Sequence, residues 1–184
     1  MEDWLSLIYK IPSEPSRYRA SVWRKIKASG AVYLQNSVCV LPASRKAERQ
    51  LRQIRHEIES YGGEGYLIKG AFLGSEQQVI DMFNHARDEE YMEIADRCED
   101  FFKEIDKEIG RKHFTYAELE ENEEDLEKLK KWFEKVRERD FFGADRMAQV
   151  AEMLEKCRER LDEFGKHVFA SEDFMREAAD VPET

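Results

Sequence analysis

The chain has 184 residues, of which 41% are hydrophobic and 38% charged, so it is long enough to bury a core as one or two small domains. A run of about 18 apolar residues is absent, which argues against a membrane-spanning helix, and Met1–Asp3 lacks the basic segment of a signal peptide. Cys39, Cys98 and Cys157 are far apart and odd in number, which argues against a disulfide framework. We therefore expect a cytoplasmic protein with reduced thiols and no membrane contact.

Charge is distributed unevenly along the chain. Residues 1–56 contain 11 Lys/Arg and 4 Asp/Glu, a net charge of +7, whereas the remaining residues carry a net charge of −17. A basic N-terminal part indicates an anionic partner such as nucleic acid. The alternative, which the composition favours equally, is that the two parts neutralise each other within the fold.

The first two predicted elements are a strand and a helix. The alternating apolar residues of 4–9 are typical of a strand. A basic amphipathic helix is predicted over 16–29, and Gly30 ends it because glycine readily adopts the left-handed conformation of a helix end. The residues that we place on its inner face are Val22, Trp23 and Ile26.

The next elements complete a small domain. A hairpin of two short strands is predicted over 31–41, followed by a helix over 43–61 with Ser44 as its N-cap. A strand over 64–74 comes last. This order predicts an α+β domain over 1–74, and we expect a ferredoxin-like βαββαβ sandwich with two helices on one face of a four-stranded antiparallel sheet.

Residues 75–171 are predicted to form a helical domain, a three-helix C-terminal layer. The helices run from 75 to 109, from Thr115 to a break at 140–143, and from 145 to 168. The apolar stripe of the first helix weakens at Arg87–Glu90, where we expect a kink or a solvent-exposed stretch, and Gly110 is expected to end it. A flexible tail is expected over 172–184.

No enzyme motif occurs in the sequence. It lacks a phosphate-binding loop, a Gly-x-Ser-x-Gly elbow, a His-Glu-x-x-His motif and a Cys-x-x-Cys pair. The four histidines stand singly, and the carboxylates of 120–125 point outward around a helix, so no metal site is predicted. The cysteines are expected to act as small core residues, with an oxidant sensor as the weaker alternative. We expect a protein that is not an enzyme and uses no cofactor.

The basic segment near the start of the chain is the candidate binding site. Its candidate contacts for nucleic acid or another anion are Lys10, Arg17, Arg19, Arg24 and Lys25. The helix N-terminus at Ser16 supplies free N–H groups, and arginine supplies a planar fork that suits a tetrahedral oxyanion. A solvated basic face without a ligand is the equally weighted alternative. Trp23 lies among these cations and is expected in the core.

Several motifs resemble the N-terminal domain of ChrB-type chromate-resistance regulators. They are Leu7-Ile8-Tyr9-Lys10, Pro12 to Arg19 (P-x-E-P-S-x-x-R), Val22 to Lys27 (V-W-R-K-x-K), Gly30 to Pro42, Phe114 to Leu129 and Arg139 to Gly143. Together they span nearly the whole chain. The resemblance implies a chromate-responsive, transcription-associated bacterial protein that forms a homodimer through its ferredoxin-like half. Full-length regulators of this type carry a further C-terminal domain.

The first half of the chain is more distantly similar to the middle domain of PaaX-type phenylacetate repressors and to the ferredoxin-like nucleases of CRISPR adaptation. Those nucleases place an aspartate at the end of the first strand, where this chain has Tyr9-Lys10. A metal-dependent phosphodiesterase needs that ligand, so the resemblance implies a non-catalytic module. A nucleic-acid phosphodiesterase is the disfavoured alternative. A second alternative is a dimerisation or interaction scaffold that binds no nucleic acid.

Overall fold

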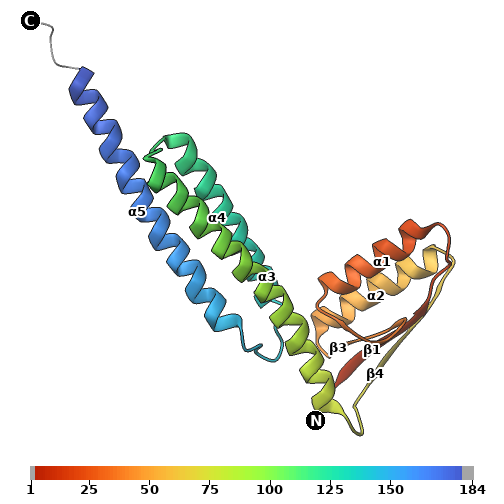
Figure 1. The fold of residues 1–184 in the computed structure, drawn as a ribbon. Helices are drawn as coiled ribbons and strands as arrows, with labels where there is room; N and C mark the ends of the chain where they lie inside the picture. Colours follow the sequence, from red (N-terminus) through yellow and green to blue (C-terminus); the bar gives the residue numbers. More distant parts are fainter. Residues whose placement is uncertain (1–2, 180–184) are drawn as a thin grey trace, which may run out of the picture. The chain divides into compact units, whose positions relative to one another are not determined.

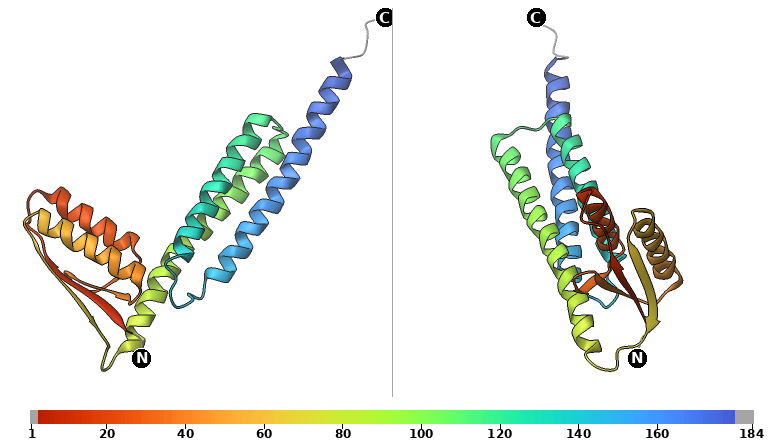
Figure 2. Two further views of the ribbon diagram at one scale, coloured as in Figure 1. Left: turned by 180° about the vertical axis from the view of Figure 1, so that it is seen from behind. Right: turned by 90° about the vertical axis from the view of Figure 1, so that its right-hand side faces the viewer.

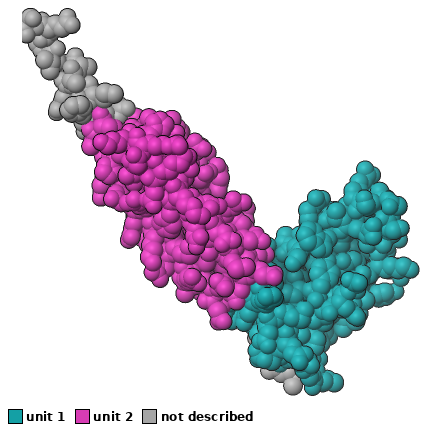
Figure 3. Space-filling view, viewed as in Figure 1, with its two compact units in different colours: residues 1–87, 139–144 teal, residues 88–138, 145–184 magenta. Residues whose placement is uncertain are grey.

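The computed structural model describes the backbone of residues 3–179 and the side chains of residues 3–171. It is an α+β structure, mostly helical, with one four-stranded antiparallel sheet and five helices in the described part (Figure 1). The chain divides into two compact units (Figure 3). Unit 1 comprises residues 1–87 and 139–144, and unit 2 comprises residues 88–138 and 145–184. The domain division at residue 74 stays a prediction.

The sheet of unit 1 is built from short strands with alternating burial. The strands are β1 (Trp4–Lys10), β2 (Val32–Gln35), β3 (Val38–Pro42) and β4 (Glu64–Gly70), in the spatial order β2-β3-β1-β4. The register places Leu7 of β1 opposite Cys39 of β3 and Leu67 of β4, so the three side chains share one face of the sheet. Leu7 and Cys39 are fully buried there.

Helices α1 (Ser16–Ala28) and α2 (Arg45–Ser60) cover this face (Figures 1 and 2). The inward side chains of α2 are Leu51, Ile54 and Ile58, which recur at helical spacing. The backbone N–H of Ala47 donates to Ser44 Oγ at 3.0 Å, which confirms Ser44 as the N-cap of α2. Gly30 ends α1 as predicted, with φ of 84°.

An aromatic cluster covers part of the opposite face of the sheet. Trp4 has its ring centroid 5.4 Å from that of Phe72, and 5.8 Å from those of Phe83 and Phe142. Each such pair contributes about 0.5–1.5 kcal/mol beyond its buried area. Phe142 belongs to the short segment 139–144, which therefore completes the core of unit 1.

The same segment approaches Gly30 closely. A Cβ atom at Gly30 would lie 2.9 Å from Cβ of Arg139 and 3.1 Å from Cε2 of Phe141. Both are closer than side-chain carbons normally pack. Gly30 is therefore required both for its left-handed conformation and for this contact.

Unit 2 is helical. Its elements are α4 (Tyr116–Arg137), α5 (Met147–Ala179) and the larger part of α3 (Glu76–Arg111). Buried side chains at helical spacing, such as Ile94 and Ile105 of α3, form its core. Thr115 Oγ1 accepts a hydrogen bond from the N–H of Glu118 at 3.3 Å, which confirms the predicted start of α4.

The course of α3 differs from the prediction in two ways. The helix is uninterrupted through Arg87–Glu90, and Arg87 is 2% exposed, so the expected solvent-exposed stretch is wrong. The helix also continues past Gly110, and the residue with left-handed conformation is Lys112, with φ of 55°.

The last helix extends further than predicted. α5 continues to Ala179, so residues 172–179 are helical, and residues 180–184 of the expected tail lie outside the described residues. In the part of the chain that the structure describes, no helix combines the length and the hydropathy needed to cross a membrane.

Candidate anion-binding surface

Helix α1 carries five cations and no acidic residue. The cations are Arg17, Arg19, Arg24, Lys25 and Lys27. Val22 and Ile26 are buried against the rest of unit 1, whereas all five cations are exposed. With no carboxylate three or four residues away on the helix, these cations cannot be neutralised within α1.

The first turn of α1 is open to an anion. Pro15 is the N-cap residue and supplies no side-chain hydrogen bond, and the first turn contains no acid. Backbone N–H groups at such a helix start carry a partial positive charge. Arg17 and Arg19 lie beside them, so two of the predicted contacts are placed where the helix dipole reinforces them.

Arg17 belongs to a stack of three planar groups. Its Cζ atom lies 5.2 Å from the centroid of the Tyr18 ring. Tyr18 in turn stacks on Tyr61, with 4.0 Å between centroids and an interplanar angle of 2°. The stack joins the start of α1 to the residue that follows α2, and it holds the arginine in a defined position.

Trp23 is on the outside of α1, which corrects the expectation that it lies in the core. Its side chain is 51% exposed, whereas Val22 next to it is 1% exposed. One residue advances the helix by about 100°, so only Val22 and Ile26 can share the buried stripe. Arg19 and Lys27 lie four residues before and after Trp23 and are both exposed, which places a cation on each side of the indole along the helix.

Lys25 differs from the other predicted contacts because it is ion-paired. Its Nζ atom donates to Oε2 of Glu57 on α2. Ser21 and Tyr61 donate to Oε1 of Glu57 at 3.0 and 2.9 Å. Burial alone would raise the pKa of Glu57, but these hydrogen bonds outweigh it and the pKa is lowered. Lys25 is therefore neutralised locally.

Lys10 is separated from the α1 cations in the sequence. It is the last residue of β1, is exposed, and pairs in register with Glu64 of β4. Within residues 3–171 the structure shows no ion pair for Lys10, Arg17, Arg19 or Arg24. Four of the five predicted contacts thus have no ion pair among the described residues, and three of them lie on α1.

Helix α2 adds cations of two kinds. Arg45, Lys46 and Arg49 are exposed near its start. Further along, Arg52 pairs with Glu48 at 2.7 Å, and the guanidinium of Arg55 lies 3.4 Å from a carboxylate oxygen of Glu59. These two pairs leave only the first part of α2 as an additional basic surface.

The cysteines are core residues, as predicted. Cys39, Cys98 and Cys157 are free and buried. Burial raises the pKa of Cys39 to about 12, so its thiol is protonated near neutral pH and is a poor nucleophile. The Cys157 thiol faces the carbonyl oxygen of Cys98 at 3.9 Å.

The arrangement on α1 suits a polyanion that also carries rings. Phosphate groups are bound by arginine, lysine and helix N-termini, and bases stack on exposed aromatic side chains. Trp23 supplies the exposed ring and the flanking cations supply the charge. Sequence reasoning missed Trp23; the signal that would have found it is the presence of Arg19 and Lys27 four residues away on either side.

Comparison with known proteins identifies the family. The model of the family described as "Protein ChrB, N-terminal" matches residues 19–175, which is most of the chain. Arg19, Arg24 and Lys25 lie inside the matched region, and Lys10 and Arg17 lie before it. No curated protein and no solved structure shows significant similarity to the chain. The match agrees with the motif resemblance, and the chain belongs to the ChrB N-terminal family.

Proposed function

We propose that this protein is a non-catalytic regulatory module associated with chromate resistance, and that it binds nucleic acid through α1. Membership of the ChrB N-terminal family supports the regulatory part of the proposal. The observation that carries the binding part is the half-exposed Trp23 between Arg19 and Lys27 on a helix without acids. Lysine and arginine bind phosphate groups and an exposed indole stacks on a base, so these three side chains together suit nucleic acid.

We infer in addition that unit 1 has the ferredoxin-like fold. Support comes from the strand order β2-β3-β1-β4, from antiparallel pairing throughout, and from two helices on one face. In such a sandwich α1 follows the strand that lies inside the sheet, so a rigid element positions the cations of α1.

A chromate-like oxyanion is the second ligand that we propose for the same surface. Chromate and a phosphate group are both tetrahedral and anionic, so both suit N–H groups of a helix start and an arginine fork. Arg17 and Arg19 stand at that start. An oxyanion bound there would compete with a phosphate of nucleic acid, which gives a physical route from effector binding to release.

Dimerisation is the second candidate role, and the open part of the sheet favours it. Ile8 lies opposite Tyr66 in the register, and Ile68 lies two residues further along β4 on the same face. These three side chains are 39%, 61% and 50% exposed. A homodimer would cover them, and it would present two α1 helices to one nucleic acid.

The test is binding of the purified protein to its own upstream DNA over a range of salt concentrations. If four cations each contact a phosphate, log Kd should rise with log salt with a slope of about 4. The variant with Arg17→Glu and Arg19→Glu should lose binding. Chromate should release the DNA, and sulfate at equal concentration serves as the control for a general anion effect.

Two outcomes contradict the proposal. Binding that survives both charge reversals places the site elsewhere on the chain. No binding at any salt concentration, together with a dimer that weakens as salt rises, supports the scaffold instead.

A further inference from the structure

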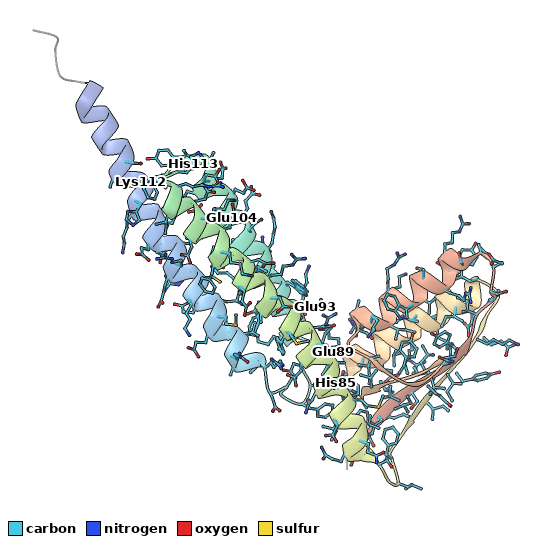
Figure 4. The ribbon with its side chains drawn as sticks, in the orientation of Figure 1. His85, Glu89, Glu93, Glu104, Lys112 and His113 are labelled. Atoms are coloured by element: carbon cyan, nitrogen blue, oxygen red, sulfur yellow. The ribbon has the colours of Figure 1, made fainter. Side chains whose placement is uncertain are left out.

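The connection between α3 and α4 brings together three side chains of the kinds that bind metal ions. They are Glu108 near the end of α3, His113 in the connection, and Glu118 in the first turn of α4. One ligand atom from each lies within 4.8 Å of the others. Figure 4 shows His113 and Lys112 where α3 gives way to α4, with Glu104 further back along α3.

Local backbone structure fixes the three residues relative to one another. The N–H of His113 donates to the carbonyl oxygen of Glu108 at 3.0 Å, and the N–H of Lys112 donates to that of Ile109 at 3.1 Å. This pair of bonds is the helix-ending motif in which the residue after the helix is left-handed, here Lys112. The cap at Thr115 then fixes the first turn of α4, which carries Glu118.

The two oxygens of Glu108 have different surroundings. Oε2 lies 2.8 Å from Nδ1 of His113, and the same nitrogen lies 3.6 Å from Oε1 of Glu118. Oε1 of Glu108 instead faces Lys107 Nζ at 3.7 Å and Arg111 at 3.8 Å. The Glu108 side chain is only 5% exposed. One oxygen thus faces the histidine while the other faces two cations.

The surroundings of the trio favour a cation overall. The three residues line a cavity of about 350 Å³. Three further carboxylates line it, those of Glu104, Glu121 and Asp125, against the two cations Lys107 and Arg111. His113 is 52% exposed, so the cavity side of the trio can be reached from solvent.

We propose that Glu108, His113 and Glu118 bind a divalent transition-metal ion, with Zn²⁺ as the best match. One imidazole nitrogen and two carboxylate oxygens are ligands of Zn²⁺, whereas Ca²⁺ and Mg²⁺ prefer oxygen alone. Ligands at about 2.0–2.1 Å from a tetrahedral ion lie about 3.3 Å apart, so small side-chain adjustments suffice. His113 would bind the ion through a neutral imidazole nitrogen, and water completes the coordination.

Lys107 and Arg111 take the supporting role in this site. They lie 3.7 and 3.8 Å from Oε1 of Glu108, and their charge favours the orientation in which Oε2 is directed toward His113. Partners of this kind orient a ligand without touching the metal. The site lies wholly within unit 2 and does not depend on the nucleic-acid surface of α1.

The experiment is a titration of the purified, chelator-treated chain with Zn²⁺, followed by calorimetry, and with Co²⁺, followed by its visible absorption. One equivalent should bind, and the melting temperature should rise with Zn²⁺ concentration because the ion binds the folded state. His113→Gln and Glu118→Gln should each weaken binding by about tenfold or more. Both residues are more exposed than Glu108, so these variants should fold, which circular dichroism checks.

Two matched controls separate the site from general charge effects. Glu152→Gln removes a carboxylate of unit 2 that does not line the cavity, and His56→Gln removes a surface histidine of unit 1; both should leave the affinity for Zn²⁺ unchanged. If the chain binds no Zn²⁺, Glu108, His113 and Glu118 form only an ion-pair cluster that stabilises the end of α3. Binding that persists in His113→Gln and Glu118→Gln would likewise overturn the proposal.

Discussion

The two units use their charged residues in different ways. Unit 1 contains 14 Lys/Arg and 10 Asp/Glu, and unit 2 contains 16 Lys/Arg and 30 Asp/Glu. In unit 2, cations lie beside carboxylates on the same helix, as in the pairs Lys103–Asp100, Lys128–Asp125 and Lys156–Glu152. On α1 of unit 1 the helix offers no acid, and only Lys25 is paired, with a residue of α2.

This difference shows that net charge is a poor guide to the surface that a protein presents. The chain carries −10 overall, which by itself argues against nucleic acid as a partner. Most cations of unit 2 have an ion pair within their own helix, whereas the cations of α1 other than Lys25 have no ion pair among the described residues. The following four experiments test this contrast.

The largest expected effect comes from reversing the charges that flank Trp23. The variant with Arg19→Glu and Lys27→Glu should bind DNA about a hundredfold more weakly or worse at low salt, because phosphate contacts are replaced by repulsion. The matched control reverses Lys103 and Lys156, which are paired in unit 2, and should bind like the wild type. Fluorescence anisotropy measures both. Equal losses of affinity in the two variants would mean that the net charge of the protein governs binding. The proposed difference between the cations of α1 and those of unit 2 would then be wrong.

Trp23 itself tests whether bases stack on α1. Trp23→Ala should weaken binding to single-stranded DNA by about 1–3 kcal/mol, the value of one stacked base. Folding stability should change little because the side chain is half exposed. Phe169→Ala, which removes an exposed ring from unit 2, is the control and should keep full affinity. If Trp23→Ala binds single-stranded DNA as tightly as the wild type, the α1 surface binds nucleic acid through its charges alone.

The ion pair between Lys25 and Glu57 should show itself in the pH dependence of stability. The pKa of Glu57 is lower in the folded protein than its ordinary value of 4.5, so the ionised form stabilises the fold above that pH. The contribution is lost as pH falls through the lowered, folded-state pKa. Glu57→Gln should therefore reduce the free energy of unfolding near neutral pH, by about 1.5–3 kcal/mol, and the difference from wild type should shrink in acid. Urea unfolding at several pH values measures it.

The smallest effect is expected for an exposed pair in unit 2. Arg137 lies 2.6 Å from Glu134, and both side chains are more than half exposed. Arg137→Ala should lower the free energy of unfolding by about 0.5 kcal/mol or less, and high salt should remove the difference. A loss as large as that of Glu57→Gln would show that the ion pairs of unit 2 stabilise the fold substantially. The two units would then differ in how much their ion pairs contribute to stability.

Local chemistry explains which elements were predictable. Ser44 and Thr115 were identified as N-caps because a hydroxyl before an apolar periodic segment has few other roles. The strands were identified from their alternation, and α2 from apolar residues at helical spacing. These signals depend on residues close in the sequence, so they hold without knowledge of the fold.

The wrong predictions concern features that a neighbouring turn or a distant segment determines, namely the burial of a side chain and the end of a helix. Trp23 was placed inside because tryptophan is hydrophobic, but the angular position next to Val22 puts it outside. Gly110 was expected to end α3, yet the hydrogen bonds of His113 and Lys112 set the end later. Those bonds also bring His113 to Glu108, a proximity that the separate spacing of the histidines did not suggest.

Unit 1 is discontinuous, and this affects how the protein is made. Phe142, which stacks near Trp4, is separated from the rest of unit 1 by the whole first part of unit 2. At a synthesis rate of about 5–20 residues per second, several seconds pass on the ribosome between the emergence of residue 87 and that of residue 144. Throughout that interval Trp4 and Phe83 lack Phe142 as a core partner, so residues 1–87 are a poor candidate for expression in isolation.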